Sequence, residues 1–436
     1  MTPYTGGNLG DWAIQEATIA NIKERYPDAC LTLVTMLPGL TSTLHGVPSI
    51  PIGRSGEWQS DPAPTTDAHE DGIDQTLVGT KRSAFGRVKE AVKSTPRMYA
   101  ALKPLHDRLW PAYGELLHIV RVYRFLRSVD LLIVSGGGQL DEYWGGPWDH
   151  PYALFKWGLL AKLTGSRFVV LSVGTCDLQS KVSVFFIRRA LRLASYRSYR
   201  DRTSKELLKD LAFTQNDEVY PDLAFSYSNS GVFENPARNH DRKVVGVSPI
   251  AYLGPGWPKE NSAVFRPYFE ALVAFVRILI ERGFAVILFS TDGPDRAIVR
   301  DMVDVLSNEK GLDVSGKLSH PRTHTLPELF EQLRQVDYVV ASRLHGVLLS
   351  HRFCLPVLAI SYDRKVDTYM EDLGLFEHCV DIHDVTTDSL VETFEALTGR
   401  SGSIRSRLRE INDRCARDLQ RQYDVVLAPG ENREAS

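Results

Sequence analysis

The chain alternates short apolar runs with longer segments of helical periodicity, and this alternation predicts its fold. Apolar runs that close on glycine or a polar residue occur at 31–34, 130–135, 167–174, 243–248, 285–290, 337–341 and 355–361. Amphipathic stretches with helical spacing lie between them, for example at 182–194, 265–282 and 326–334. Buried strands that alternate with helices are typical of a parallel, doubly wound sheet, so we predict an α/β protein.

The strand and helix pattern is interrupted and then restarts, which predicts two domains. A chain of 436 residues is long for a single core. Residues 228–242 are polar and rich in turn formers, so we assign a linker there. We expect an N-terminal domain at 1–232, a C-terminal domain at 240–400, and a helix at 401–428 that crosses back to the first domain. The carboxyl edges of two such sheets would enclose a ligand cleft.

Composition narrows the functional classes. With 43% hydrophobic and 24% charged residues the chain is an ordinary globular protein, and its net charge of −3 argues against a nucleic-acid-binding surface. The five cysteines form no CxxC pair and no metal-ligand spacing appears, so we expect no metal and a reducing cytoplasm. We expect no signal peptide, because the first residues contain neither a basic nor an apolar region, and no membrane-spanning helix, because no apolar run reaches about 18 residues. No pattern indicates an oligomeric state.

Two polar stretches of the N-terminal half are predicted at the surface. Residues 53–79 read as a mobile insertion, and residues 81–109 are basic with apolar residues between the charges. The basic stretch has two interpretations: a solvated helix face, or a peripheral contact with the inner face of a membrane that carries a lipid-linked acceptor. Almost no chain precedes the first glycine-rich loop, so we expect the first sheet to lack an edge or the chain start to be misassigned.

Glycine-rich loops at predicted strand ends are the first candidate binding elements. Gly6-Gly7-Asn8-Leu9-Gly10-Asp11 opens a helix, for which Asp11 is the expected N-cap, and Gly136-Gly137-Gly138 follows the strand at 130–135. Such loops expose backbone N–H groups that suit a phosphate or a carboxylate. A tight turn that packs on a sheet is the alternative interpretation.

The segment from Val339 to Ser350 is the strongest candidate site. A buried strand ends here and a helix begins with Ser342-Arg343-Leu344-His345-Gly346, in which Ser342 is the expected N-cap. Arg343 and His345 would lie where a helix start offers free N–H groups and positive dipole, a good anion site with an acid or base beside it. The alternatives are a structural ion pair for Arg343 and a satisfied core histidine at His345.

Further charged residues follow other strand ends. Arg200 closes the strand that begins near Arg197, and Asp222 follows the turn at Pro221. Lys365 follows Asp363 after the strand at 355–361, where it could neutralise a phosphate or form an interdomain ion pair. Asp11, Asp222 and Asp292 could each accept a hydrogen bond from a sugar hydroxyl or cap a helix.

Taken in order, these motifs resemble the polysaccharide pyruvyl transferase family over nearly the whole chain. The most specific part is Ser342-Arg343-Leu344-His345-Gly346 with the downstream Tyr362-Asp363-x-Lys365, followed by the loop Gly7-Asn8-Leu9-Gly10-Asp11. The resemblance implies two Rossmann-like domains arranged as in GT-B glycosyltransferases. It also implies transfer of pyruvate from phosphoenolpyruvate to a sugar of a cell-surface polysaccharide or its precursor, as a ketal, with no cofactor.

The resemblance places phosphoenolpyruvate at the Arg343–Leu344–His345 segment and at Arg200, and His345 is our candidate acid or base. The substrate-binding candidates are Arg200, Leu344, Gly346, Lys365, Asn8, Gly10, Asp11, Gly136, Gly137, Gly138 and Asp222. Two alternatives stay open: a GT-B glycosyltransferase that uses a nucleotide sugar, and a family member that tailors a small molecule.

Overall fold

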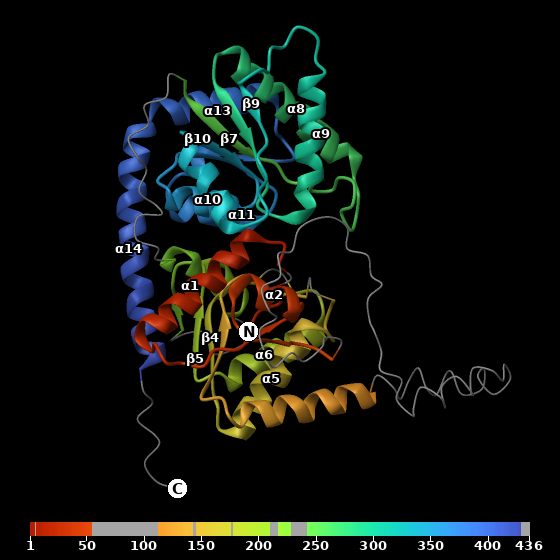
Figure 1. Ribbon diagram of the computed structural model, residues 1–436, viewed down its shortest axis with the longest axis vertical. Coiled ribbons are helices and arrows are strands. Elements are labelled where there is room, and N and C mark those ends of the chain that lie inside the picture. Colours follow the sequence, from red (N-terminus) through yellow and green to blue (C-terminus); the bar gives the residue numbers. More distant parts are fainter. Residues whose placement is uncertain are drawn as a thin grey trace, which may run out of the picture.

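The computed structural model describes residues 1–4, 6–54, 112–142, 145–175, 178–209, 217–227 and 242–428. It has two α/β units, one above the other in Figure 1, with the long helix α14 (Ser401–Leu427) along one side of both. The predicted insertion at 53–79, the basic stretch at 81–109 and the linker at 228–242 lie largely outside the described residues. No helix of the described part is long and apolar enough to cross a membrane.

The C-terminal unit is built on a six-stranded parallel sheet in the order β12-β11-β10-β7-β8-β9. Numbered along the unit, this order is the doubly wound 3-2-1-4-5-6, whose switch point lies between β7 and β10. Its strands are β7 (Val244–Ser248), β8 (Ala285–Leu288), β9 (Leu318–Ser319), β10 (Tyr338–Ala341), β11 (Val357–Ser361) and β12 (Cys379–Asp381). Its helices are α8 (Ser262–Glu281), η3 (Gly293–Asp295), α9 (Arg296–Ser307), α10 (Leu326–Gln335), α11 (Leu344–Arg352), α12 (Arg364–Asp372), η4 (Phe376–His378) and α13 (Thr387–Gly399).

The N-terminal unit has the same winding. Its strands are β1 (Leu33–Thr35), β2 (Ser49–Pro51), β3 (Leu131–Ser135), β4 (Arg167–Val173), β5 (Tyr196–Tyr199) and β6 (Glu218–Val219), paired as β1-β2 and β3-β4-β5-β6. Its helices are α1 (Leu9–Arg25), α2 (Pro38–His45), α5 (His150–Thr164), α6 (Lys181–Leu193), α7 (Arg202–Leu207), η2 (Leu223–Ser226) and a helix at 112–126.

The first residues of the chain lie between β1 and β3 and join the two parts of this sheet. The nitrogen of Met1 donates to Ile133 O (2.7 Å), and Ser135 N donates to Met1 O (3.3 Å). On the other side Thr2 N donates to Val34 O (3.0 Å). This short extended segment therefore occupies the first-strand position of the doubly wound order, directly before the loop Gly6–Asp11.

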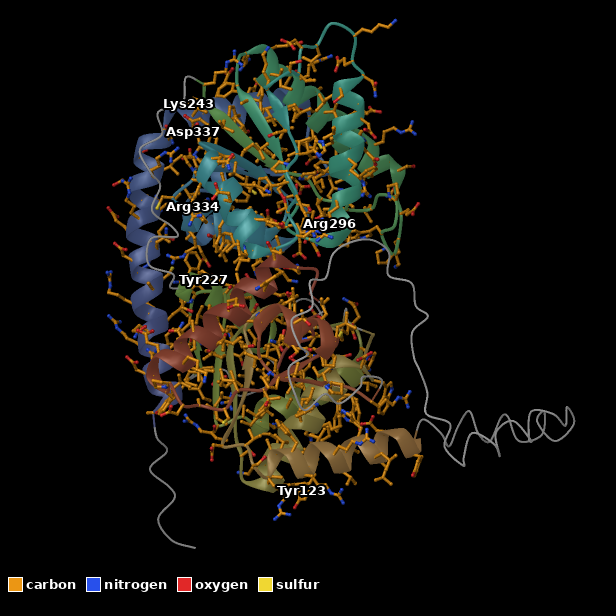
Figure 2. All side chains as sticks on the ribbon, viewed as in Figure 1. Tyr123, Tyr227, Lys243, Arg296, Arg334 and Asp337 are labelled. Atoms are coloured by element: carbon orange, nitrogen blue, oxygen red, sulfur yellow. The ribbon has the colours of Figure 1, made fainter. Side chains whose placement is uncertain are left out.

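Helix α1 lies between the two units and joins their cores (Figure 1). Its apolar side chains Leu9, Trp12 and Ile14 belong to the same buried cluster as the C-terminal strands. Lys243 and Asp337, labelled in Figure 2, form an ion pair (3.3 Å) at the amino ends of β7 and β10. The opposite, carboxyl ends of these strands point toward α1 and the N-terminal unit.

Helix α14 contacts both units along its length. Arg405 Nη2 donates to Asp337 O (2.6 Å) in the C-terminal unit. Near its other end, Gln422 accepts from Ser172 Oγ (3.0 Å) and donates to Ser198 Oγ (2.7 Å) in the N-terminal sheet. Ser172 has a left-handed backbone (φ 47°) at an irregularity of β4, so this helix holds a strained position of the other unit.

Candidate active site

His345 enters the junction of the two units at the start of α11, directly after β10. The carboxyl end of β10 is at the switch point of its sheet, where doubly wound proteins bind ligands. Its imidazole lies against the first turn of α1, because a Cβ placed on Gly10 would be only 1.9 Å from His345 Cγ. The absence of a side chain at Gly10 is therefore what allows His345 to occupy this position.

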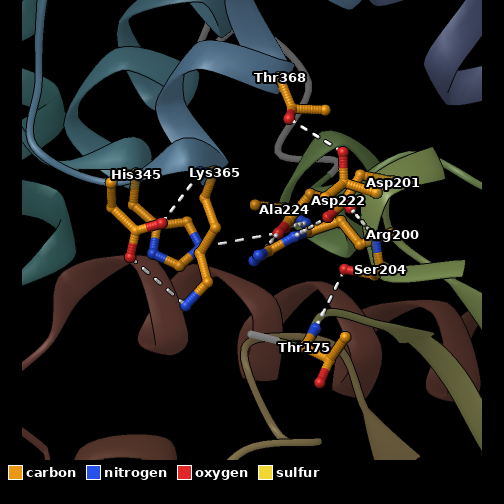
Figure 3. Close-up of polar contacts among 11 residues, drawn as sticks. Thr175, Arg200, Asp201, Ser204, Asp222, Ala224, His345, Lys365 and Thr368 are labelled. Carbon is orange, nitrogen blue, oxygen red and sulfur yellow. Dashed lines mark hydrogen bonds and ion pairs between the residues drawn. The ribbon is translucent and has the colours of Figure 1, made fainter. Parts of the chain in front are cut away.

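The other edge of the imidazole faces a carboxylate of the N-terminal unit. His345 Nε2 lies 3.6 Å from Asp222 Oδ2, which is ion-pair distance and slightly longer than a hydrogen bond. A dashed line in Figure 3 marks this contact. Asp222 also accepts from Ala224 N (2.9 Å) as the N-cap of η2, and from Arg200 Nη1 (3.3 Å). The three side chains form a line Arg200–Asp222–His345 that crosses from one unit to the other.

The electrostatics of Asp222 fit a carboxylate that stays ionised. Burial alone would raise its pKa, but the nearby imidazole of His345, the Arg200 guanidinium and the N–H of Ala224 lower it to about 2. Arg200 is itself fixed over Gly174, where a Cβ would be 2.6 Å from Nη2. The imidazole therefore has a permanent anion beside Nε2.

Arg343 does not point toward open space but is held by two carboxylates of its own unit. Its Nε and Nη2 bind Asp295 at 2.5 and 3.1 Å, and its Nη1 lies 3.0 Å from Asp292. The side chain of Asp295 is fully buried, and it also accepts from Ala251 N (2.9 Å). The structural ion pair, which was the alternative interpretation of Arg343, is thus present.

Two expected helix caps are wrong. The N-cap of α1 is Asn8, whose Oδ1 accepts from Gly10 N and Asp11 N, so Asp11 lies within the first turn, three residues after the cap. The N-cap of α11 is Arg343, because the hydroxyl of Ser342 turns into the core and meets Tyr268 Oη (3.1 Å). The nearby tyrosine offers this serine a buried partner that a local reading of the chain cannot anticipate.

The loop Gly6–Asp11 binds the C-terminal unit through its backbone. Asn8 forms an isolated antiparallel bridge with Asp292, Leu9 N donates to Thr291 O (2.9 Å), and Gly293 N donates to Gly7 O (3.2 Å). This loop, expected to hold a ligand, therefore also joins the two units.

The triple-glycine loop faces Lys365. Gly136 and Gly137 have left-handed backbones (φ 54° and 70°), which glycine adopts without strain. Gln139 Nε2 donates to Ser135 O and Gly136 O (both 2.8 Å) and ties these carbonyls back. A Cβ on Gly138 would lie 3.8 Å from Lys365 Nζ, so the lysine of α12 reaches across to this loop.

The predicted site residues thus fall into four groups. The junction brings together His345, Asp222, Arg200, Lys365, Asp11 and the glycines Gly10, Gly136, Gly137 and Gly138. Asn8 caps a helix there, Arg343 is held by two carboxylates of its own unit, and Leu344 and Gly346 are packed against the core. Sequence reasoning missed Asp295, although the clustered turn Thr291-Asp292-Gly293-Pro294-Asp295 was a signal for it. Among the described residues no group of three or more His, Cys, Asp or Glu side chains could hold a metal ion.

Comparison with known proteins gives one family and one fold. Residues 8–364 match the family model described as polysaccharide pyruvyl transferase. Among solved structures, a glycosyltransferase from Rickettsia africae is similar at a TM-score of 0.54 with 8% identity, covering 99% of this chain and 98% of that one. S. aureus MnaA, in a structure with UDP, is similar at a TM-score of 0.51 with 12% identity, covering 94% of this chain and 90% of that one. The UDP-GlcNAc 2-epimerase from Methanocaldococcus jannaschii is similar at a TM-score of 0.50 with 10% identity, covering 90% of each chain. The predicted two-domain Rossmann-like fold is thereby confirmed.

Proposed function

The chain belongs to the polysaccharide pyruvyl transferase family, and on that premise we propose that it moves pyruvate from phosphoenolpyruvate onto a sugar of a cell-surface polysaccharide or its precursor, as a ketal. The observation that carries this proposal is the position of His345, at the switch point of its own sheet and in contact with the glycine loop and Asp222 of the other unit. A proton carrier at that place suits the first step of ketal formation.

The donor is held by cations and backbone N–H groups. Phosphoenolpyruvate carries about three negative charges, which need several fixed donors. Lys365 offers an ammonium group beside the triple-glycine loop, in which the N–H of Gly136 already donates to Leu171 O (2.8 Å) and those of Gly137 and Gly138 are left for a ligand among the described residues. All three guanidinium nitrogens of Arg343 lie within 3.1 Å of a carboxylate oxygen, so we assign it chiefly to fixing the start of α11 and only secondarily to the donor.

Ketal formation begins with a proton transfer to phosphoenolpyruvate. His345 gives a proton to C3 of the enol, and C2 becomes an oxocarbenium-like centre. A sugar hydroxyl attacks C2 and loses its proton to a base of the site, and the bond between C2 and the bridging phosphate oxygen breaks. A second hydroxyl attacks C2, and its proton leaves with the phosphate. Ionised Asp222 stabilises the doubly protonated imidazole before the first transfer.

Isothermal titration calorimetry and a phosphate-release assay test the proposal. We expect the protein to bind phosphoenolpyruvate and not UDP-glucose, and to release phosphate faster when 4-nitrophenyl hexosides are present. His345→Ala should lower turnover about 100-fold or more, whereas His320→Ala, at an exposed position of the same unit, should not change it. Binding of UDP-glucose without phosphoenolpyruvate would favour a glycosyltransferase and refute the proposal.

A further inference from the structure

Asp11 lies at the centre of the junction and has no assigned partner there. It stands in the first turn of α1, one residue after the glycine that contacts His345. Its carboxylate lies against the triple-glycine loop, because a Cβ on Gly137 would be 3.3 Å from Asp11 Oδ1. The missing side chain of Gly137 leaves room for this carboxylate, or for a small ligand beside it.

The neighbouring carboxylates are all engaged, whereas that of Asp11 is not. Asp222 binds Arg200, Asp292 binds Arg343, and Asp363 accepts from the backbone of Lys365. Within the part of the chain that the structure describes, no hydrogen bond or ion pair holds the carboxylate of Asp11. A partly buried carboxylate without a partner is costly unless a ligand provides one.

The charges around Asp11 come from five elements. They are His345 on α11, Asp222 before η2, Arg200 after β5, Lys365 on α12 and Asp292 before η3. Burial raises the pKa of Asp11 against the opposing effect of His345, with Asp222 raising it further and Arg200 and Lys365 lowering it. The pKa values of two carboxyl groups in one site are thus separated, because that of Asp11 is raised and that of Asp222 is lowered to about 2. Environments that separate two carboxyl groups in this way assign them different roles in proton transfer.

We propose that Asp11 is the base that takes the proton from the attacking sugar hydroxyl, a role that rests on the pyruvyl transfer proposed above. The O–H bond of the hydroxyl breaks as its oxygen bonds to C2, and the proton moves to a carboxylate oxygen of Asp11. His345 has by then given its proton to C3. The pair resets when Asp11 passes its proton to His345, and the proton of the second hydroxyl leaves with the phosphate. The N-terminal unit therefore deprotonates the acceptor while the C-terminal unit protonates the donor.

The test compares Asp11→Asn with Glu24→Gln, an exposed carboxylate further along the same helix. Both keep the N-cap Asn8, so α1 should still begin at Leu9. We expect Asp11→Asn to bind phosphoenolpyruvate with wild-type affinity by calorimetry, but to lower kcat of phosphate release about 100- to 10,000-fold. The low-pH limb of the kcat/KM profile should also change. If no 4-nitrophenyl hexoside is accepted, the same comparison can be made on phosphate release with water as the nucleophile. Water must also lose a proton when its oxygen bonds to C2.

Rescue gives a readout that a merely structural role would not move. Asp11→Ala removes the carboxylate and leaves space beside Gly137. Added formate should therefore raise the phosphate-release rate of this variant by about tenfold or more over its rate without formate. Wild-type turnover by Asp11→Asn, or an Asp11→Ala rate indifferent to formate, would overturn the assignment of Asp11. Failure of the wild-type protein to bind phosphoenolpyruvate is a separate result that would overturn the pyruvyl transfer itself.

Discussion

Replacement of Gly10 by alanine tests whether the contact between the two units positions His345. The added Cβ would lie 1.9 Å from Cγ and 2.0 Å from Nδ1 of the imidazole. Carbon atoms in contact are about 3.5 Å apart, so the ring would have to retreat by about 1.5 Å. The atoms closest to this Cβ belong to the ring and to the Cβ of His345, near the backbone, where the side chain has little freedom to yield.

This displacement should remove activity without unfolding the protein. Nε2 would move out of its 3.6 Å approach to Asp222, and a misplacement of about 1 Å can cost about 100-fold in rate. Alanine favours a helix over glycine by about 1 kcal/mol, so α1 itself should not be weakened. We expect kcat/KM for phosphate release to fall about 100-fold, with an unchanged circular dichroism spectrum.

The matched control is Gly7→Ala, three residues earlier in the same loop. A Cβ there would meet nothing closer than Asp292 Oδ1 at 3.8 Å, an ordinary van der Waals contact. Its activity should stay close to that of the wild type. Full activity of Gly10→Ala, or equal losses in both variants, would refute the reasoning that the space at Gly10 positions His345.

Three further perturbations have defined outcomes. Asp295→Ala leaves the buried guanidinium of Arg343 without its two-point partner and should lower the free energy of unfolding by about 3–5 kcal/mol in urea titrations. Burial lowers the pKa of His150 and His351 to about 3. Below about pH 6.5 these histidines therefore bind protons in the unfolded chain but stay neutral in the folded protein. The free energy of unfolding should fall by about 2 kcal/mol per histidine between pH 7 and pH 5. Asp222→Asn should lower kcat about 100-fold without raising the KM for phosphoenolpyruvate, because a negative charge has been removed from an anion site.

Each of these has a contrasting result. Arg282→Ala breaks an exposed ion pair with Glu395 and should change the free energy of unfolding by less than about 1 kcal/mol. Equal urea midpoints at pH 7 and pH 5 would show that the buried histidines accept protons in the folded state. An Asp222→Asn variant with wild-type kcat would show that the imidazole does not depend on this carboxylate.

Much of the fold could be predicted because periodicity is local. Apolar runs such as 337–341 are strands in the structure, and the glycines at 136–138 follow a strand end as expected. The triple-glycine loop and the Arg343–His345 segment could also be identified, since each is a continuous stretch at a strand end. Which residues these two segments contact depends on the tertiary structure and not on the local sequence. The carboxylate of Asp295, 48 residues from Arg343, changes that arginine from a free cation to a bound one.

The caps show the same division at a smaller scale. Asn8, Asp11 and Ser342 all have side chains that can cap a helix, and residue type alone does not rank them. Asn8 takes the position because its loop is fixed by the bridge to Asp292, and Ser342 loses it because Tyr268 offers a buried partner. Tertiary contacts decided both cases, and they also placed Gly10 against His345.

Helix α14 has a consequence for how the molecule is made. Its residues Leu419, Tyr423 and Val426 complete the packing around the N-terminal sheet, and Gln422 holds the strained Ser172. Chains leave the ribosome from the N-terminus, so the first unit emerges long before the segment that finishes it. It therefore stays incompletely packed until α14 has been synthesised. We therefore expect His345, Asp222 and Asp11 to come together only in a chain that includes α14, and a protein that ends before α14 should lack an assembled site.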